Sequence, residues 1–345
     1  MHDRAHPLLL LLWLSLATAL VACAAPSAGS RPTGLVEDSP IGPRQPYALV
    51  LGTAQDGGLP QIGCENVCCR AAYADPDRRR LVTSVLIVDP RTGKRFLLDA
   101  TPDLPEQVER CRGLPPNRDA RIAAATGSGA MGRPPLFDGI FPTHAHLGHY
   151  AGLAFLGREA YGSRATPVHA SERMSRYLTS NGPWSLLVDD GAIELVPLAD
   201  GQTVELGPEL TLRAIRVPHR EEFTDAYAFL VRGPQRALLY LPDIDKWERW
   251  STPIEELIAA VDVALLDGTF FDGSELPERD MQEIAHPAIV ESLTRFATLP
   301  AAERTKVVFT HLNHSNPAAD PASEEARAVD RAGMRLARER QRFGL

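Results

Sequence analysis

The stretch FPTHAHLGHYAGL, residues 141–153, places three histidines within six positions. Imidazole nitrogens are common ligands of Zn²⁺ and of other transition metals, and two histidines that are two residues apart in a loop can bind one cation. His144 and His146 form such a pair, and His149 can reach a neighbouring site. The stretch therefore predicts a metal centre of one or two ions, with Zn²⁺ expected and iron or manganese as alternatives.

Three more metal-competent side chains follow apolar, strand-like runs. His219 follows LTLRAIRVP, Asp243 follows RALLYLP, and His311 follows KVVFT. Polar groups that leave several strands in this way are expected to meet at one edge of a sheet sandwich. We prefer Asp243 to Asp245 as the bridging carboxylate, because Asp243 emerges first from the apolar run and Asp245 is placed to cap the next helix.

A second cluster contains cysteines. Cys64, Cys68 and Cys69 lie in one short loop, and Cys111 is distant. A disulfide between the adjacent Cys68 and Cys69 would be strained, whereas three thiolates and one histidine make a closed tetrahedral zinc site. The loop therefore favours a structural Zn²⁺. A disulfide stays open as the alternative, because an exported protein meets oxidising surroundings.

The N-terminus has the pattern of an export signal. Arg4 precedes a short apolar run that ends in Leu-Val-Ala-Cys, with the cysteine at position 23. This pattern predicts a lipoprotein signal peptide over residues 1–22, with Cys23 lipidated and the protein held at the bacterial cell envelope, on the periplasmic face of the outer membrane in a Gram-negative cell. A plain signal peptide and an uncleaved anchor are the alternatives. Residues 23–46 are rich in Pro, Gly and Ser and predict a flexible tether.

Residues 47–345 have the composition and patterning of one domain. The chain is 44% hydrophobic and 23% charged, and its formal net charge of −8 argues against nucleic acid as a partner. Short apolar or β-branched runs bounded by Gly, Pro or Asp predict strands from Tyr47 to His311. Helical patterns fall between them, at about 104–112, 149–157, 171–180, 253–260, 287–297 and 322–341.

The order THAHxxH, a later His, a later Asp and a last His resembles the metallo-β-lactamase superfamily. The resemblance implies an α/β fold, the αββα sandwich, in which two mixed β-sheets are flanked by helices and metals lie at one edge. It implies that the first metal is held by His144, His146 and His219 and the second by His149, Asp243 and His311, with Asp243 bridging. Gly148 departs from the usual pattern, which has Asp there, so the second metal is expected to be weak, replaced or absent.

The stretches LGTAQDGGLPQIGCENVCC, LLDATPDL, LLDGTFF and HLNHSNP narrow the resemblance to the family of pyrroloquinoline quinone biosynthesis protein B and of phosphodiesterases with a cysteine-rich loop. This family implies that His314, three positions after His311, is the fourth ligand of the cysteine site. It also places a histidine near the substrate, which makes His286 a proton donor to a leaving group. A structural histidine at a helix N-terminus is the equal alternative.

Three functions fit these residues. The first is a metal-dependent hydrolase that uses metal-activated water on a phosphoester, ester or amide of a small-molecule or peptide-derived substrate, with Asp243 orienting the water. The second is an oxidative or accessory role in quinone cofactor biosynthesis, because an open iron site also suits oxygen chemistry. The third is a ligand-binding protein without catalysis. The substrate and the oligomeric state stay open.

Overall fold

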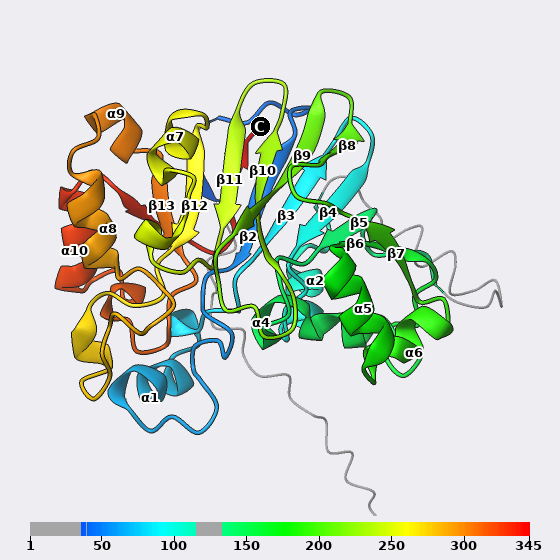
Figure 1. The fold of residues 1–345 in the computed structure, drawn as a ribbon, viewed down its shortest axis with the longest axis horizontal. Coiled ribbons are helices and arrows are strands. Elements are labelled where there is room, and N and C mark those ends of the chain that lie inside the picture. The colour runs from blue at the N-terminus through cyan, green and yellow to red at the C-terminus, as the bar shows by residue number, and fades with distance from the viewer. Residues whose placement is uncertain (1–35, 39, 115–132) are drawn as a thin grey trace, which may run out of the picture. The chain divides into compact units, whose positions relative to one another are not determined.

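The structure is a computed structural model that describes residues 36–38, 40–114 and 133–345 (Figure 1). The expected signal peptide and Cys23 lie outside the described residues. Across the described part, no helix has the length and apolar character needed to cross a membrane.

Two mixed sheets form the centre of the fold. Within the described residues the first sheet has eight strands in the order β1-β15-β2-β3-β4-β5-β6-β7, and the second has seven in the order β14-β13-β12-β11-β10-β9-β8. The strands of the first sheet are β1 (Val36–Glu37), β2 (Tyr47–Gly52), β3 (Ser84–Asp89), β4 (Lys94–Leu98), β5 (Gly139–Phe141), β6 (Thr166–Ala170), β7 (Ile193–Pro197) and β15 (Gln341–Gly344). Those of the second are β8 (Thr203–Gly207), β9 (Leu210–Val217), β10 (Ala226–Arg232), β11 (Ala237–Leu241), β12 (Val263–Asp267), β13 (Val307–Thr310) and β14 (Arg335–Leu336).

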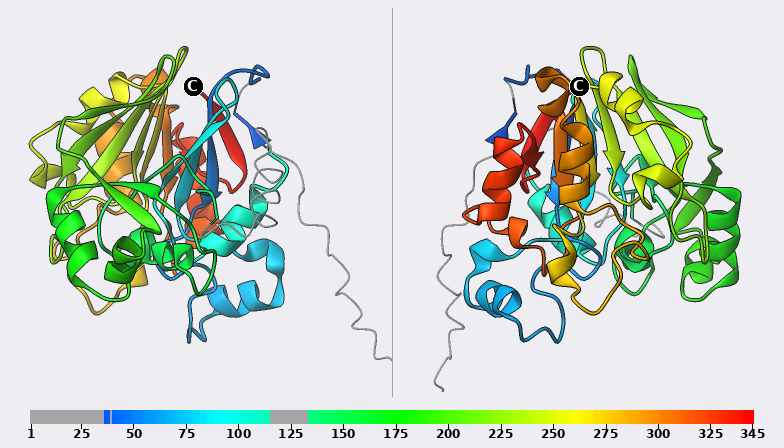
Figure 2. Two further views of the ribbon diagram at one scale, coloured as in Figure 1. Left: turned by 90° about the vertical axis from the view of Figure 1, so that its right-hand side faces the viewer. Right: turned by 60° about the vertical axis from the view of Figure 1, so that its left-hand side comes forward.

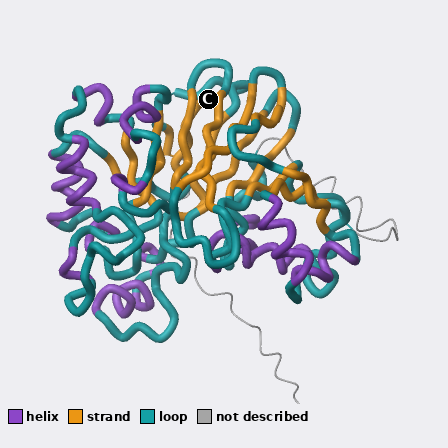
Figure 3. The backbone as a smooth tube through the Cα atoms, in the orientation of Figure 1, coloured by secondary structure: helices purple, strands orange, loops and turns teal. Residues whose placement is uncertain are grey.

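The helices of the described residues surround the two sheets, and most of them lie against the outer faces (Figure 1). They are α1 (Val67–Ala74), α2 (Leu104–Arg110), α4 (Leu147–Tyr150), α5 (Glu172–Ser180), α6 (Trp184–Asp189), α7 (Ile254–Ala259), α8 (Ile289–Phe296), α9 (Ala301–Arg304) and α10 (Glu324–Arg331), with 3₁₀ segments η1 (Pro76–Arg78), η2 (Ala151–Leu156), η3 (Trp247–Arg249), η4 (Gly273–Glu275) and η5 (Pro317–Ala319). Figures 2 and 3 show the strands in the middle, with α5 and α6 on one side and α8 and α10 on the other. The αββα sandwich is therefore confirmed.

Side-chain alternation along the strands produces the layers. In β10, Tyr227, Phe229 and Val231 pack between the sheets, while the alternate residues face the layer of α7 and α8. A strand with both faces buried is expected to be apolar, and β10 follows that rule up to the exposed Arg232 at its end. Fully burying a side chain such as Phe229 stabilises the fold by about 1.5–3 kcal/mol. The inter-sheet layer therefore fixes the strand ends from which the polar groups emerge.

Both ends of the described domain differ from the prediction. The tether was expected to extend to residue 46, but β1 pairs in parallel with β15, and Asp38 forms ion pairs with Arg236 and Arg335. The helix expected over 322–341 ends at Arg331, because Gly333 adopts a φ of 78° and turns the chain into β14. Both segments take their form from pairing with distant strands, and a local sequence pattern carries no information on such pairing.

Candidate metal centre

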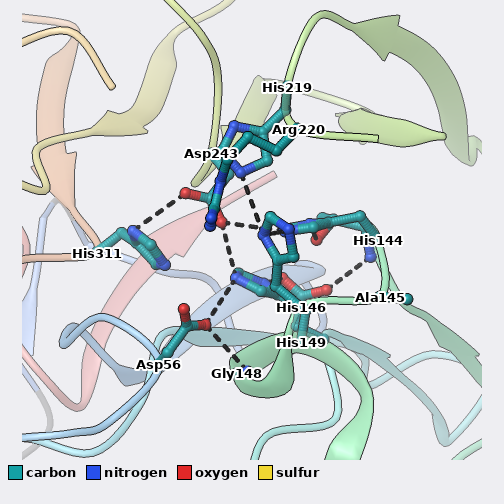
Figure 4. A network of polar contacts seen from close by, with 12 residues as sticks. Asp56, His144, Ala145, His146, Gly148, His149, His219, Arg220, Asp243 and His311 are labelled. Atoms are coloured by element: carbon teal, nitrogen blue, oxygen red, sulfur yellow. Dashed lines mark hydrogen bonds and ion pairs between the residues drawn. The ribbon is translucent and has the colours of Figure 1, made fainter. Parts of the chain in front are cut away.

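The polar side chains of the centre follow strands whose carboxyl ends lie at one edge of each sheet. In the first sheet, β2 and β4 run the same way because both are antiparallel to β3, and β5 is parallel to β4. In the second sheet, β9, β11, β12 and β13 share one direction for the same reason. Asp99 leaves the end of β4. The side chains that leave the other ends and are labelled in Figure 4 are Asp56 after β2, His144, His146 and His149 after β5, His219 after β9, Asp243 after β11 and His311 after β13.

The first group brings together His144, His146, His219 and Asp243, each with one ligand atom within 4.8 Å of the others. The Nδ1 atom of His146 lies 2.8 Å from Nε2 of His144 and 3.2 Å from Nε2 of His219. Ligand nitrogens of a tetrahedral zinc site, at about 2.0–2.1 Å from the ion, lie roughly 3.3 Å apart. These residues fit a zinc ion with small side-chain adjustments.

Burial keeps two of these imidazoles neutral. It lowers the pKa of His144 well below its usual range and lowers the pKa of His219 to about 4. A histidine must be neutral to bind a metal, so both side chains are in the required form at neutral pH. His146 is more accessible, and its Nε2 lies 3.1 Å from a carboxylate oxygen of Glu222. Such a partner orients the ring and leaves Nδ1 for the ion.

The second group contains Asp56, His149 and His311, whose ligand atoms also lie within 4.8 Å of one another. Asp243 lies between the groups, with Oδ2 at 2.8 Å from His149 Nε2 and 3.4 Å from His144 Nε2, and Oδ1 at 3.4 Å from His311 Nδ1. Burial opposes ionisation of Asp243, but the surrounding histidines hold its pKa well below the usual range. A carboxylate between two clusters of imidazoles is suited to bridging two cations.

Asp99 orients His149 from behind. The Nδ1 atom of His149 lies 2.8 Å from Asp99 Oδ2, and the same carboxylate accepts hydrogen bonds from Thr143 N and the Tyr240 hydroxyl. All of these groups are buried. With Nδ1 held by Asp99, Nε2 of His149 faces Asp243 and the metal edge. Asp99 therefore supports the metal edge without belonging to any of the ligand groups.

His286 stands beside the centre and is also held by a carboxylate. Its Nδ1 lies 2.8 Å from Asp267 Oδ2, at the end of β12, and 3.4 Å from Asp243 Oδ1. Burial disfavours the imidazolium, but Asp267 and Asp243 raise the pKa of His286 above its ordinary value. His286, Asp243 and His311 form a third group of potential ligands. Both roles named for His286, proton donor and structural residue, are compatible with this position.

The cysteine loop meets the loop after β13. Cys64, Cys68, Cys69 and His314 form a fourth group of potential ligands, and all three cysteines are free thiols. The Sγ atoms of Cys68 and Cys69 lie 3.9 Å apart, and His314 Nδ1 lies 3.4 Å from the sulfur of Cys69. Sulfur ligands of a tetrahedral zinc ion, at about 2.3 Å, lie roughly 3.7 Å apart. This arrangement fits a closed zinc site, and Cys111 lies apart from it in the hydrophobic core.

Two residues of the centre were not predicted from the sequence. Asp56 joins His149 and His311, and Glu222 contacts His146. An aspartate in the glycine-rich stretch QDGG was the available signal for Asp56, whereas nothing in the sequence distinguished Glu222. Asp245, the rejected bridging candidate, accepts a hydrogen bond from the next backbone N–H and pairs with an exposed arginine, away from the ligand groups.

Comparison with known families agrees with this geometry. A family model described as a beta-lactamase superfamily domain matches residues 94–312. The chain belongs to the beta-lactamase superfamily. Curated relatives within it include coenzyme PQQ synthesis protein B of Methylobacterium nodulans, 26% identical over 308 residues, which cover 83% of this chain and 95% of that protein. The same protein of Rhodopseudomonas palustris is 26% identical over 312 residues, 84% of this chain and 96% of the relative.

Solved structures of superfamily members share the fold. Zn²⁺-bound PqqB from Methylobacterium extorquens superposes with a TM-score of 0.71 at 21% identity, over 87% of this chain and 100% of that one. A diphosphatase from the PhnP family gives a TM-score of 0.59 at 24% identity, over 87% and 97% of the two chains. At these identities the likeness shows a common fold, and the chemistry must be argued from the site.

Proposed function

We propose that this superfamily member is a metal-dependent hydrolase of a small-molecule phosphodiester, ester or amide. The observation that supports the proposal most is the convergence of His144, His146, His219 and Asp243, next to a second ligand group that shares Asp243. Two-metal hydrolytic sites hold their ions about 3.5–4 Å apart. A carboxylate within reach of both groups suits that spacing.

The metal ligands, Asp243 and His286 have different roles in the proposed hydrolysis. When bound here, Zn²⁺ supplies a water whose pKa is lowered to near 7 and polarises the bond to be cleaved. Asp243 would orient the attacking water through Oδ1, which has no hydrogen-bond partner among the described residues. His286, whose Nδ1 is held by Asp267, keeps Nε2 available to give a proton to the leaving group.

Two exposed apolar side chains stand near the centre and favour a substrate with an apolar leaving group. Leu147 follows His146 directly and is 60% exposed, and Phe223 follows Glu222 and is 56% exposed. Small-molecule sites are lined largely by apolar and aromatic side chains around a few polar groups. Aryl esters and aryl phosphodiesters are therefore the first substrates to test.

The test compares two aspartates that are two residues apart. Hydrolysis of bis(p-nitrophenyl) phosphate and p-nitrophenyl esters is measured on the full chain with Zn²⁺ or Mn²⁺. We expect Asp243→Asn to lower kcat/KM roughly 100-fold or more, because it removes a charge from the metal edge. Asp245→Asn should change kcat/KM by less than about twofold, because Asp245 lies outside the ligand groups. Equal activity in both variants contradicts the proposal, and bound metal without any turnover favours a binding protein.

A role in quinone cofactor synthesis is the second candidate. It is favoured by relatives named coenzyme PQQ synthesis protein B and by the third ligand group, Asp243, His286 and His311. Two histidines and one carboxylate are the ligand set of many non-haem iron oxygenases. If the protein is such an oxygenase, His286→Gln should remove the bound Fe²⁺. If it is a hydrolase, the same substitution should leave the metal content unchanged and alter the pH dependence of kcat. Metal content therefore separates the two functions.

We also propose that the protein is exported and held at the cell envelope through a lipid on Cys23. The support is the short apolar run that ends in Leu-Val-Ala-Cys. Cell fractionation of the full chain tests this. Cys23→Ser should move the protein out of the membrane fraction. The proposal is contradicted if the distribution does not change and mass spectrometry shows no added acyl chains on the parent chain.

A further inference from the structure

Gly148 leaves a space in the histidine loop that another segment of the chain fills. A Cβ atom added at Gly148 would lie 2.2 Å from Asp56 Oδ1, 2.8 Å from Asp56 Cα and 3.1 Å from Asp56 Cγ. The first two distances are too short for any real Cβ contact and the third is tight, because carbon contacts are optimal at about 3.5–4.0 Å. Asp56 therefore occupies the place that a side chain at position 148 would take.

The carboxylate of Asp56 is held in this place by the histidine loop itself. The backbone N–H of Gly148 donates a hydrogen bond to Asp56 Oδ1 at 3.0 Å, and the same oxygen lies 3.6 Å from His149 Nε2 (Figure 4). His311 completes the group, and its buried Nε2 has no hydrogen-bond partner among the described residues. A buried imidazole nitrogen without a partner is costly unless a ligand satisfies it.

The turn that carries Asp56 is attached to the loop that carries His311. Gln55 N donates to Leu312 O at 2.9 Å, and the Asn313 side-chain amide donates to the Gln55 side chain at 2.7 Å. Gly58 then adopts a φ of 69° and closes the turn through a hydrogen bond to Gln55 O. The position of Asp56 is therefore fixed from both sides of the centre.

We propose that Asp56 is the carboxylate ligand of the second metal and replaces the aspartate that the motif lacks at Gly148. The second site then consists of His149, His311, Asp56 and the shared Asp243, two nitrogen and two carboxylate ligands, which suits a divalent cation. The expected weak or missing second metal followed from the motif alone. With Asp56 included, the second site is complete. This inference rests on the metal centre of the proposed function.

The proposal is tested by moving the carboxylate between the two positions. Bound metal per chain is counted by elemental analysis, and zinc affinity is measured by competition with a chelator. Asp56→Ala should weaken binding of one ion per chain by roughly 100-fold or more, since loss of groups that only support a ligand already costs 10–100-fold. Gly148→Asp alone should not improve binding, because its side chain collides with Asp56. Asp56→Gly combined with Gly148→Asp should recover the ion lost in Asp56→Ala.

A matched control is Asp103→Asn. Asp103 accepts a hydrogen bond from Val82 N near the same glycine turn, outside the ligand groups, and its substitution should leave the metal count unchanged. The proposal is overturned if Asp56→Ala retains the second ion at unchanged affinity, or if the double variant binds no better than Asp56→Ala. Failure of the proposed function has a different signature, in which the unaltered chain binds metal normally but hydrolyses none of the substrates.

Discussion

The cysteine site gives the sharpest prediction about stability. Replacing Cys69 by Ser, or removing the metal with a chelator, should release helix α1 and its loop while the two sheets stay folded. The segment has little core of its own, because its small cluster contains Ala54, Leu59, Cys69 and Ala72 as fully buried members. Burying Leu59 and two small side chains stabilises by about 3–5 kcal/mol.

The metal is the larger contribution. Structural zinc sites bind with about 10–16 kcal/mol in small zinc domains, and that free energy is coupled to folding. Burial also raises the pKa of the Cys69 thiol to about 12, so without a cation this thiol is protonated and cannot act as a thiolate ligand or partner. The loop therefore depends on the metal more than on packing.

Hydrogen exchange measured by mass spectrometry checks this prediction. Amide protection across Val67–Ala74 should fall at least about 100-fold in Cys69→Ser, equivalent to roughly 2.7 kcal/mol, while protection of β10 and β12 is retained. Cys111→Ala is the matched control, because Cys111 is buried in the core outside the site. Unchanged protection of α1 after metal removal refutes the reasoning. If the chain mass is two hydrogens below that of the reduced chain and two of the loop's thiols are lost, the loop holds a disulfide instead of a metal.

Three further predictions concern positions around the sheets. Gly152→Ala should destabilise the protein by about 1–3 kcal/mol in thermal or urea unfolding, because its Cβ would lie 2.1 Å from a backbone carbonyl oxygen; an unchanged midpoint contradicts this. Asp99→Asn should weaken second-site metal affinity about 10–100-fold by releasing His149, and an unchanged affinity in chelator competition argues against it. Burial raises the pKa of Glu275 to about 7, so the stability that its protonation provides is present below about pH 4.5 and is lost as the pH rises through 7. Glu275→Gln should therefore match the parent near pH 4.5 and exceed its unfolding free energy by about 1 kcal/mol at pH 8, and equal stability at pH 8 would count against the assignment.

Much of the site was predictable because it depends on local patterns. Apolar runs such as the one before Asp243 form strands, and parallel strands bring their carboxyl ends to one edge. The histidine loop, His219 and His311 therefore come together as expected. The fourth ligand of the cysteine loop was expected from the family resemblance, and His314, in the loop after β13, does lie with the three cysteines.

The contribution of Asp56 was not predictable from such patterns. Asp56 and Gly148 are 92 positions apart, and their contact depends on how the turn after β2 is attached to the loop after β13. A motif comparison detects the missing carboxylate at Gly148 but has no information on what fills the space. The C-terminal helix was overextended for a similar reason, because β14 and β15 owe their form to pairing with distant strands.

The number of metal ions bound per chain tests the central claim most directly. The full chain should retain up to three ions when loaded with Zn²⁺, two in the active centre and one at the cysteines, and His146→Ala should lower the count while leaving the cysteine site filled. A single ion that is lost on substitution of Cys69 and unaffected by His146→Ala would contradict the account, because the active centre would then bind no metal.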